Sequence, residues 1–146
     1  MPQTRQGVLP YNLEAEQSVL GSILIDMELQ YEIVSKLKES DFYLEAHKLI
    51  FASIFSLNAK NRPVDVVTLS DDMEKCATLE KAGGMDYITE LAKSTPSAAN
   101  YQYYLDIVKR DSTLRKLIRS ADEIIKDAVK KFAGEFIERK IKLEYT

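Results

Sequence analysis

The chain has 146 residues, of which 45% are hydrophobic and 29% charged, and its formal net charge is -3. This length suits one domain with a sizeable core, and the apolar fraction excludes intrinsic disorder as the starting expectation. Five glycines and four prolines are few for an all-β sandwich, and one cysteine and one histidine exclude an internal disulfide, a multi-thiolate zinc site and a two-histidine metal site. We therefore expect an all-α protein of a reducing compartment, the cytoplasm.

The first hundred residues predict a flexible arm, residues 1–12, followed by a globular helical head, residues 13–100, with about five or six helices. Asn12 and Asp65 are predicted N-caps, and Ser40 or Asp41 is expected to cap the helix that follows them. Glycine pairs and prolines interrupt the helical pattern between elements. The expected helices cover residues 13–25, 29–37, 44–58, 66–76 and 85–92.

The last third of the chain predicts one long helix. From Ala98 to about Phe132 the sequence holds no proline or glycine, and apolar residues recur every seven positions along two neighbouring lines. About 35 helical residues span roughly 50 Å, which exceeds the width of a domain of this size. We therefore expect residues 101–146 to project as a long helix or helical hairpin that serves association.

The apolar face of this helix is the candidate binding site, and we call it the association stripe. Burying six or seven large side chains is worth on the order of 10 kcal/mol before the costs of association. The stripe therefore favours contact with another helix, from this chain or from a second copy. The alternative is a shorter helix that folds back onto its own core. The association stripe consists of Leu114, Leu117, Ile118, Ala121, Ile124, Ile125 and Phe132.

Sequence signatures of catalysis are missing from this chain. No lysine follows any of the five glycines, which excludes a P-loop, and no Gly-x-Gly-x-x-Gly fingerprint occurs. His47 is the single candidate base and has no identifiable catalytic partners, so we expect it to make local hydrogen bonds. No apolar run approaches the roughly 20 residues that cross a bilayer. We expect no catalytic, cofactor-binding or metal site, and no membrane association.

An ordered series of short motifs resembles the start of DnaB-type replicative DNA helicases. The resemblance covers about residues 8–130, and its order is more specific than any single motif. It begins with Pro10-Tyr11-Asn12-Leu13-Glu14-Ala15-Glu16-Gln17-Ser18-Val19-Leu20-Gly21 and continues with Asp41-Phe42-Tyr43, His47, Arg62-Pro63-Val64-Asp65, Gly83-Gly84, Tyr87, Pro96-Ser97-Ala98-Ala99-Asn100, Tyr104 and Arg115-Lys116-Leu117-Ile118.

This resemblance implies an N-terminal domain made of a small helical head and a helical hairpin. In the family, such domains associate into a collar on a hexameric ring and dock the C-terminal domain of the DnaG-type primase, and a helicase loader is a further expected partner. The resemblance also implies that ATP, Mg and DNA are bound by the motor domain of the parent helicase. The chain itself would then be no enzyme, but part of an ATP-dependent helicase that unwinds DNA in replication.

The tail departs from the family pattern after Val129. Residues 135–146 would make about three helical turns, which is enough only for a short return arm of a hairpin.

The alternative function is a helix-turn-helix DNA-binding regulator with a dimerising C-terminal helix. The charge of residues 1–100 disfavours this DNA-binding function, because they carry 9 Lys and Arg residues but 15 Asp and Glu residues. A recognition helix in the head would face the negative phosphates of DNA, which acidic side chains repel. Residues 101–146 carry 11 basic against 8 acidic residues, interleaved as on a solvated helix face.

Overall fold

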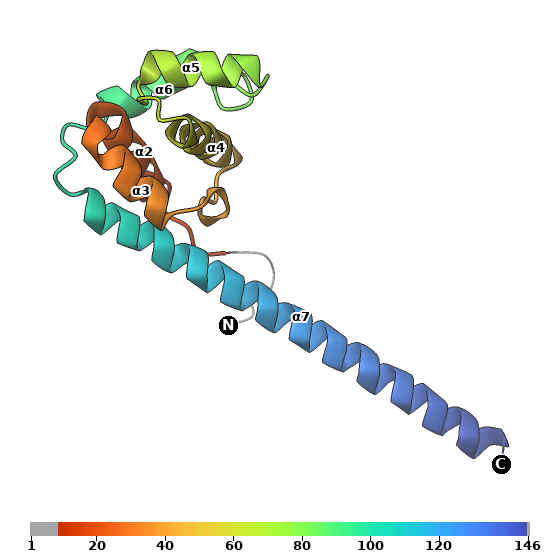
Figure 1. Cartoon of the computed structure of the whole chain (residues 1–146). Helices are drawn as coiled ribbons and strands as arrows, with labels where there is room; N and C mark the ends of the chain where they lie inside the picture. The colour runs from red at the N-terminus through yellow and green to blue at the C-terminus, as the bar shows by residue number, and fades with distance from the viewer. Residues whose placement is uncertain (1–8, 146) are drawn as a thin grey trace. The chain divides into compact units, whose positions relative to one another are not determined.

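The protein is all-α, as predicted. The structure, a computed structural model, describes the backbone of residues 9–145 and the side chains of residues 9–139, and no strand occurs in that part of the chain (Figure 1). Two short 3-10 helices, η1 (Met27–Leu29) and η2 (Glu39–Asp41), flank α3. The α-helices are α2 (Leu13–Ile25), α3 (Gln30–Lys36), α4 (Glu45–Ala59), α5 (Val66–Lys75), α6 (Gly84–Lys93) and α7 (Tyr101–Tyr145).

Contacts divide the chain into two compact units, and the boundary falls inside α7. Residues 10–113 form the head, and the residues from Leu114 onward belong to the other unit. The head thus includes the first three turns of α7, not only residues 13–100, because Leu105 and Val108 are buried in its core. The expected arm of residues 1–12 lies mostly outside the described residues. Of its last residues, Tyr11 stacks on Tyr43 with ring centroids 4.2 Å apart.

The core of the head is built from the apolar faces of the five helices α2 to α6 and of the first turns of α7. Its largest fully buried side chains include an aromatic pair, Phe42 and Phe51, whose ring centroids are 5.1 Å apart. Each of these helices turns its buried residues inward at spacings of three and four, which is the helical period. The residues of this core that are almost wholly excluded from solvent include Val19, Leu20, Ile23, Ile50, Ile54, Leu69, Met73, Ile88 and Leu91.

Local signals in the sequence set most helix boundaries. Asn12 caps α2, because its side chain accepts a hydrogen bond from the Ala15 N–H at 2.9 Å. Asp65 and Thr68 form a reciprocal capping box at the start of α5. Gly83, at φ +99°, precedes α6 in a left-handed conformation that favours glycine. The five head helices lie within two residues of their predicted ends.

One local prediction was wrong. Neither Ser40 nor Asp41 caps α4; Leu44 stands at that position, and its side chain makes no capping hydrogen bond. The final helix begins at Tyr101, and Ser97 accepts a hydrogen bond from the Ala99 N–H in a turn that precedes this helix.

Of the two alternatives predicted for the end of the chain, a long helix or a helical hairpin, the structure has the long helix. Helix α7 continues through Gly134 to Tyr145, a total of 45 residues. A return arm of a hairpin therefore does not form within the described residues. One glycine inside a helix costs only about 1 kcal/mol, and neighbouring residues with good helix propensity carry the helix past it.

Candidate interaction surface

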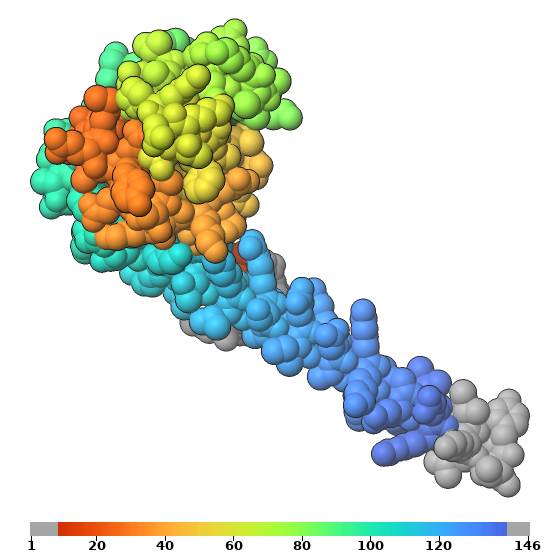
Figure 2. Space-filling view, in the orientation of Figure 1, coloured from red at the N-terminus to blue at the C-terminus, as the bar shows by residue number. Residues whose placement is uncertain are grey.

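The association stripe lies on the part of α7 that begins at Leu114. Of its large residues, only Ile118 is half-buried; the others are exposed. In Figure 2, several side chains of this blue segment protrude from the surface of the helix. The exposed fractions are 41% for Leu114, 61% for Leu117, 68% for Ile124, 37% for Ile125 and 69% for Phe132.

Helical geometry gathers the stripe on one side of α7. At 100° per residue, the two lines with a seven-residue repeat fall within a sector of about 60°, and Leu117 and Ile124 widen it on one edge. Val129 and Phe136 extend the apolar surface and are 60% and 57% exposed. Single exposed apolar residues are ordinary, but a contiguous apolar face several turns long indicates a surface that binds another protein.

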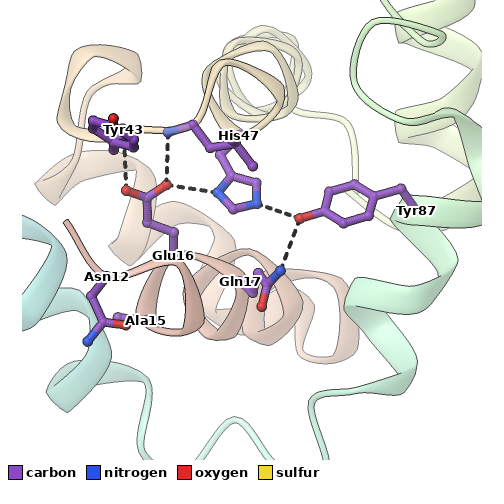
Figure 3. A network of polar contacts seen from close by, with 8 residues as sticks. Asn12, Ala15, Glu16, Gln17, Tyr43, His47 and Tyr87 are labelled. Carbon is purple, nitrogen blue, oxygen red and sulfur yellow. Dashed lines mark hydrogen bonds and ion pairs between the residues drawn. The ribbon is translucent and has the colours of Figure 1, made fainter.

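The head carries a buried polar network that sequence reasoning only partly foresaw. His47, wholly buried on α4, places Nδ1 2.8 Å from the Glu16 carboxylate and Nε2 2.6 Å from the Tyr87 hydroxyl (Figure 3). The Gln17 side-chain amide also donates to this hydroxyl at 3.3 Å. Both ring nitrogens of His47 are thus engaged, but not in the local hydrogen bonds that we expected, because the partners come from α2 and α6, 31 and 40 positions away.

Glu16 supplies the cap that the sequence around α4 lacks. Its carboxylate accepts hydrogen bonds from the Tyr43 N–H at 2.8 Å and the Leu44 N–H at 3.4 Å, just before α4 begins. A negative charge at this position also complements the positive end of the helix dipole. The buried carboxylate therefore ties α2 to the start of α4, which is a structural role and not a catalytic one.

A second buried carboxylate, Asp41, fixes the first turns of α7 within the head. It accepts hydrogen bonds from the Ser112 hydroxyl at 2.6 Å and the Lys38 N–H at 2.8 Å, and Lys109 lies 3.4 Å away. Burial alone would raise the pKa of Asp41. The hydrogen bonds and the Lys109 charge outweigh burial, so the pKa lies below the ordinary value of 3.8.

Two further features, a metal-binding cluster and a membrane-spanning helix, are missing from the described residues. Among the described residues, no three His, Cys, Asp or Glu side chains are grouped so that they could hold a metal ion. No helix within the described ranges is both long and apolar enough to span a membrane.

The sequence matches a known family over most of its length. The family model described as DnaB-like helicase N terminal domain matches residues 8–110. The chain belongs to this family. The replicative DNA helicase DnaB of Buchnera aphidicola is 44% identical to it over 117 residues, which are 80% of this chain and 25% of that protein. The chain thus spans about a quarter of the length of this curated relative.

Solved DnaB N-terminal domains have the same fold. The N-terminal domain of the Mycobacterium tuberculosis DnaB helicase superposes with a TM-score of 0.80 at 31% identity, covering 84% of this chain and 85% of that one. The N-terminal domain of the Helicobacter pylori DnaB helicase, described together with its interactions with primase, gives a TM-score of 0.67 at 26% identity. That match covers 78% of this chain and 89% of the other. Family membership does not favour the helix-turn-helix alternative.

Proposed function

We propose that this chain is the assembly and primase-docking domain of a hexameric replicative DNA helicase. The observation that carries the proposal is the exposed association stripe on α7 of a DnaB-family domain. The description of the Helicobacter pylori relative with primase supports a primase as the second partner. The mechanism is binding: the head provides a fixed scaffold, and the stripe joins copies of the domain.

Energetics support self-association through the stripe. Its six large side chains are worth on the order of 10 kcal/mol when fully buried, and their partial exposure leaves about half of that to be gained. Association costs several kcal/mol in lost translational and rotational freedom, so the remaining surplus corresponds to a modest affinity. Several domains held on one ring would bind each other more tightly, because tethering raises their effective concentration.

The parent protein would supply what this chain lacks. We assign ATP and Mg binding, DNA contact and DNA unwinding to a motor domain, and we expect a helicase loader as a possible further partner of the assembled ring. Replication in the cytoplasm is the setting that this function requires.

The double variant Ile118→Asp and Ile125→Asp tests the proposal. Two charges in the middle of the stripe oppose its burial, so self-association should be lost while helix content stays unchanged. Sedimentation equilibrium measures the first effect and circular dichroism the second. The matched control is Ser120→Asp with Ala133→Asp, which adds the same charge at exposed positions of α7 outside the stripe and should leave association unchanged.

The same proteins test primase docking. Titration of the C-terminal domain of a DnaG-type primase into the unaltered chain should give saturable binding in calorimetry. If the paired surface recruits primase, the stripe variant binds at least tenfold more weakly and the control variant binds normally. An unchanged molar mass of the stripe variant relative to the unaltered chain would refute the assembly role.

A further inference from the structure

The buried network in Figure 3 joins a hydroxyl, an imidazole and a carboxylate, and the proposed function does not use their reactivity. The Tyr87 hydroxyl oxygen lies 2.6 Å from Nε2 of His47, and Nδ1 of the same ring lies 2.8 Å from a Glu16 carboxylate oxygen. A hydroxyl beside a base that a third group orients is the arrangement that activates nucleophiles in covalent chemistry. Tyr87 occupies the place of the nucleophile.

The partners in this network determine where the hydrogens lie. The Glu16 carboxylate also accepts two backbone N–H groups ahead of α4, so it offers His47 only an acceptor, and Nδ1 carries the ring hydrogen. Nε2 of the uncharged ring is then an acceptor, and the Tyr87 O–H donates to it. The Gln17 amide, 3.3 Å from the Tyr87 oxygen, donates to that oxygen and leaves its hydrogen free for His47. The phenolic hydrogen of Tyr87 therefore points at a base.

Packing fixes the Tyr87 side chain at the edge of the head. Its ring stacks on the His47 ring, with centroids 6.0 Å apart and an angle of 11° between the planes. A Cβ atom at Gly83 would lie only 2.8 Å from Cβ of Tyr87, so the Gly83 backbone packs against this side chain. His47 is wholly buried, whereas Tyr87 and Gln17 are half-buried. The network thus runs from the surface of the head inward, and a reagent in solvent meets the Tyr87 end first.

The surroundings of the hydroxyl favour an acyl electrophile over a phosphoryl electrophile. Among the described residues, the Tyr87 hydroxyl makes hydrogen bonds to His47 and Gln17 alone. Phosphoryl transfer needs cations that neutralise the charge of the transferred group, and neither neighbour is a permanent cation. Acyl transfer needs a hydrogen-bond donor for one developing oxyanion, and the Gln17 N–H beside the attacking oxygen is placed to supply it.

We propose that Tyr87 is a site of covalent modification by activated acyl compounds, with His47 as its base. The Tyr87 oxygen attacks the carbonyl carbon of the acyl donor and forms a C–O bond. The bond from this carbon to the leaving group breaks, and its electron pair goes to the leaving group. The phenolic proton moves to Nε2 of His47 and from there to the leaving group, so the product is an acyl ester of Tyr87. Glu16 is a positioning residue, because it acts only through the His47 ring.

N-acetylimidazole tests the proposal on the unaltered chain, with Tyr31 and Tyr103 as internal controls. Both controls are more accessible, with exposed fractions of 75% and 67%, and the chain has no second histidine to assist them. A positioned general base accelerates proton transfer by about 100-fold or more, and partial burial of Tyr87 offsets part of this gain. Peptide mapping by mass spectrometry at pH 7 should therefore show Tyr87 acetylated about tenfold faster than either control.

The ratio of the rates at Tyr87 and Tyr31 should also depend on pH. An unassisted phenol reacts as its phenolate, whose fraction rises about tenfold per pH unit below a pH of about 10. Tyr87 gives its proton to His47 instead, so its advantage over Tyr31 should fall as the pH rises from 7 to 9. A tyrosine with a purely structural role would react more slowly than the exposed controls at every pH.

The variant His47→Gln removes the base but keeps a polar side chain in the network. The rate at Tyr87 should then fall to that of the controls or below it, while circular dichroism checks that the helix content is unchanged. If this variant does not fold, the comparison within the unaltered chain still decides. Acetylation of Tyr87 no faster than that of Tyr31 and Tyr103 would overturn the proposal, and so would an undiminished rate at Tyr87 in a folded His47→Gln protein.

Discussion

Glu16 is a buried carboxylate that joins α2 to the start of α4. One carboxylate receives two backbone N–H groups ahead of α4 and faces the buried His47 ring. Removing it leaves these groups buried without their partner, and each buried unpaired group costs about 1 to 3 kcal/mol.

We predict that Glu16→Ala lowers the free energy of unfolding of the head by about 3 kcal/mol. Urea denaturation followed by circular dichroism, at one fixed protein concentration, measures the change. Glu14→Ala is the matched control two residues away, because Glu14 is exposed, and its effect should stay within about 0.5 kcal/mol. Equal effects of the two variants would contradict the role assigned to Glu16.

Asp41 makes the stability of the head depend on pH. Its pKa is lower in the folded state than the ordinary 3.8, so the folded state favours the ionised carboxylate. The resulting stabilisation is complete above pH 3.8 and is lost as the pH falls through the lower folded-state pKa.

We predict that Asp41→Asn destabilises the head by about 1 to 3 kcal/mol at pH 7. The difference from the unaltered chain should begin to shrink as the pH falls below 3.8, and it should be smallest below the folded-state pKa of Asp41, where both proteins carry an uncharged side chain at this position. Urea denaturation at a series of pH values measures this difference in the free energy of unfolding. Asp71→Asn, at a 61% exposed side chain paired with Lys75, serves as control and should change stability little at any pH.

At the scale of the helices, two glycines have opposite roles. A Cβ atom at Gly21 of α2 would lie 2.6 Å from the Leu91 carbonyl oxygen of α6 and closer still to the Thr95 hydroxyl. Gly21 thus permits the close approach of the two helices. A Cβ at Gly134 of α7 would meet no atom within 4 Å.

Gly→Ala substitutions should therefore change stability in opposite directions. We expect Gly21→Ala to destabilise the head by roughly 1 to 3 kcal/mol, because the carbonyl cannot move without disturbing α6. Gly134→Ala should stabilise α7 locally by about 1 kcal/mol, since alanine has the higher helix propensity. Urea denaturation measures the destabilisation by Gly21→Ala. Slower amide hydrogen exchange around residue 134 reports the stabilisation by Gly134→Ala. A destabilising effect at both sites would be inconsistent with this account.

The helices were predictable from sequence where their determinants are local. The N-cap residues Asn12 and Asp65 and the prolines affect only the backbone next to them. These local signals predicted the ends of the five head helices to within two residues. The sequence left open whether residues 101–146 form one helix or a hairpin, because Gly134 resembles a stop signal in sequence but costs little inside a helix with strong neighbours.

Long-range pairings were not predictable in the same way. Glu16 and His47 are 31 positions apart and Asp41 and Ser112 are 71 apart, so no periodicity or spacing joins them. Glu16, His47 and Tyr87 all occur in the motifs of the family resemblance, which was the available signal. The association stripe was readable from its seven-residue repeat, and the structure adds that most of its large side chains are exposed.

At the scale of the whole molecule, the two units have separate tasks in this account. The head is held together by an apolar core and by two buried carboxylates, Glu16 and Asp41. The part of α7 beyond Leu114 carries an exposed apolar surface, and covering that surface would be favourable. In the proposed function, the head is the scaffold and this surface is the site of assembly.

The central claim is that the association stripe joins copies of this chain, and sedimentation equilibrium of the unaltered chain tests it most directly. The chain mass is 16.6 kDa. With rising concentration, the account predicts a weight-average molar mass that climbs to at least twice this value. A mass that stays at 16.6 kDa up to millimolar concentration would contradict it.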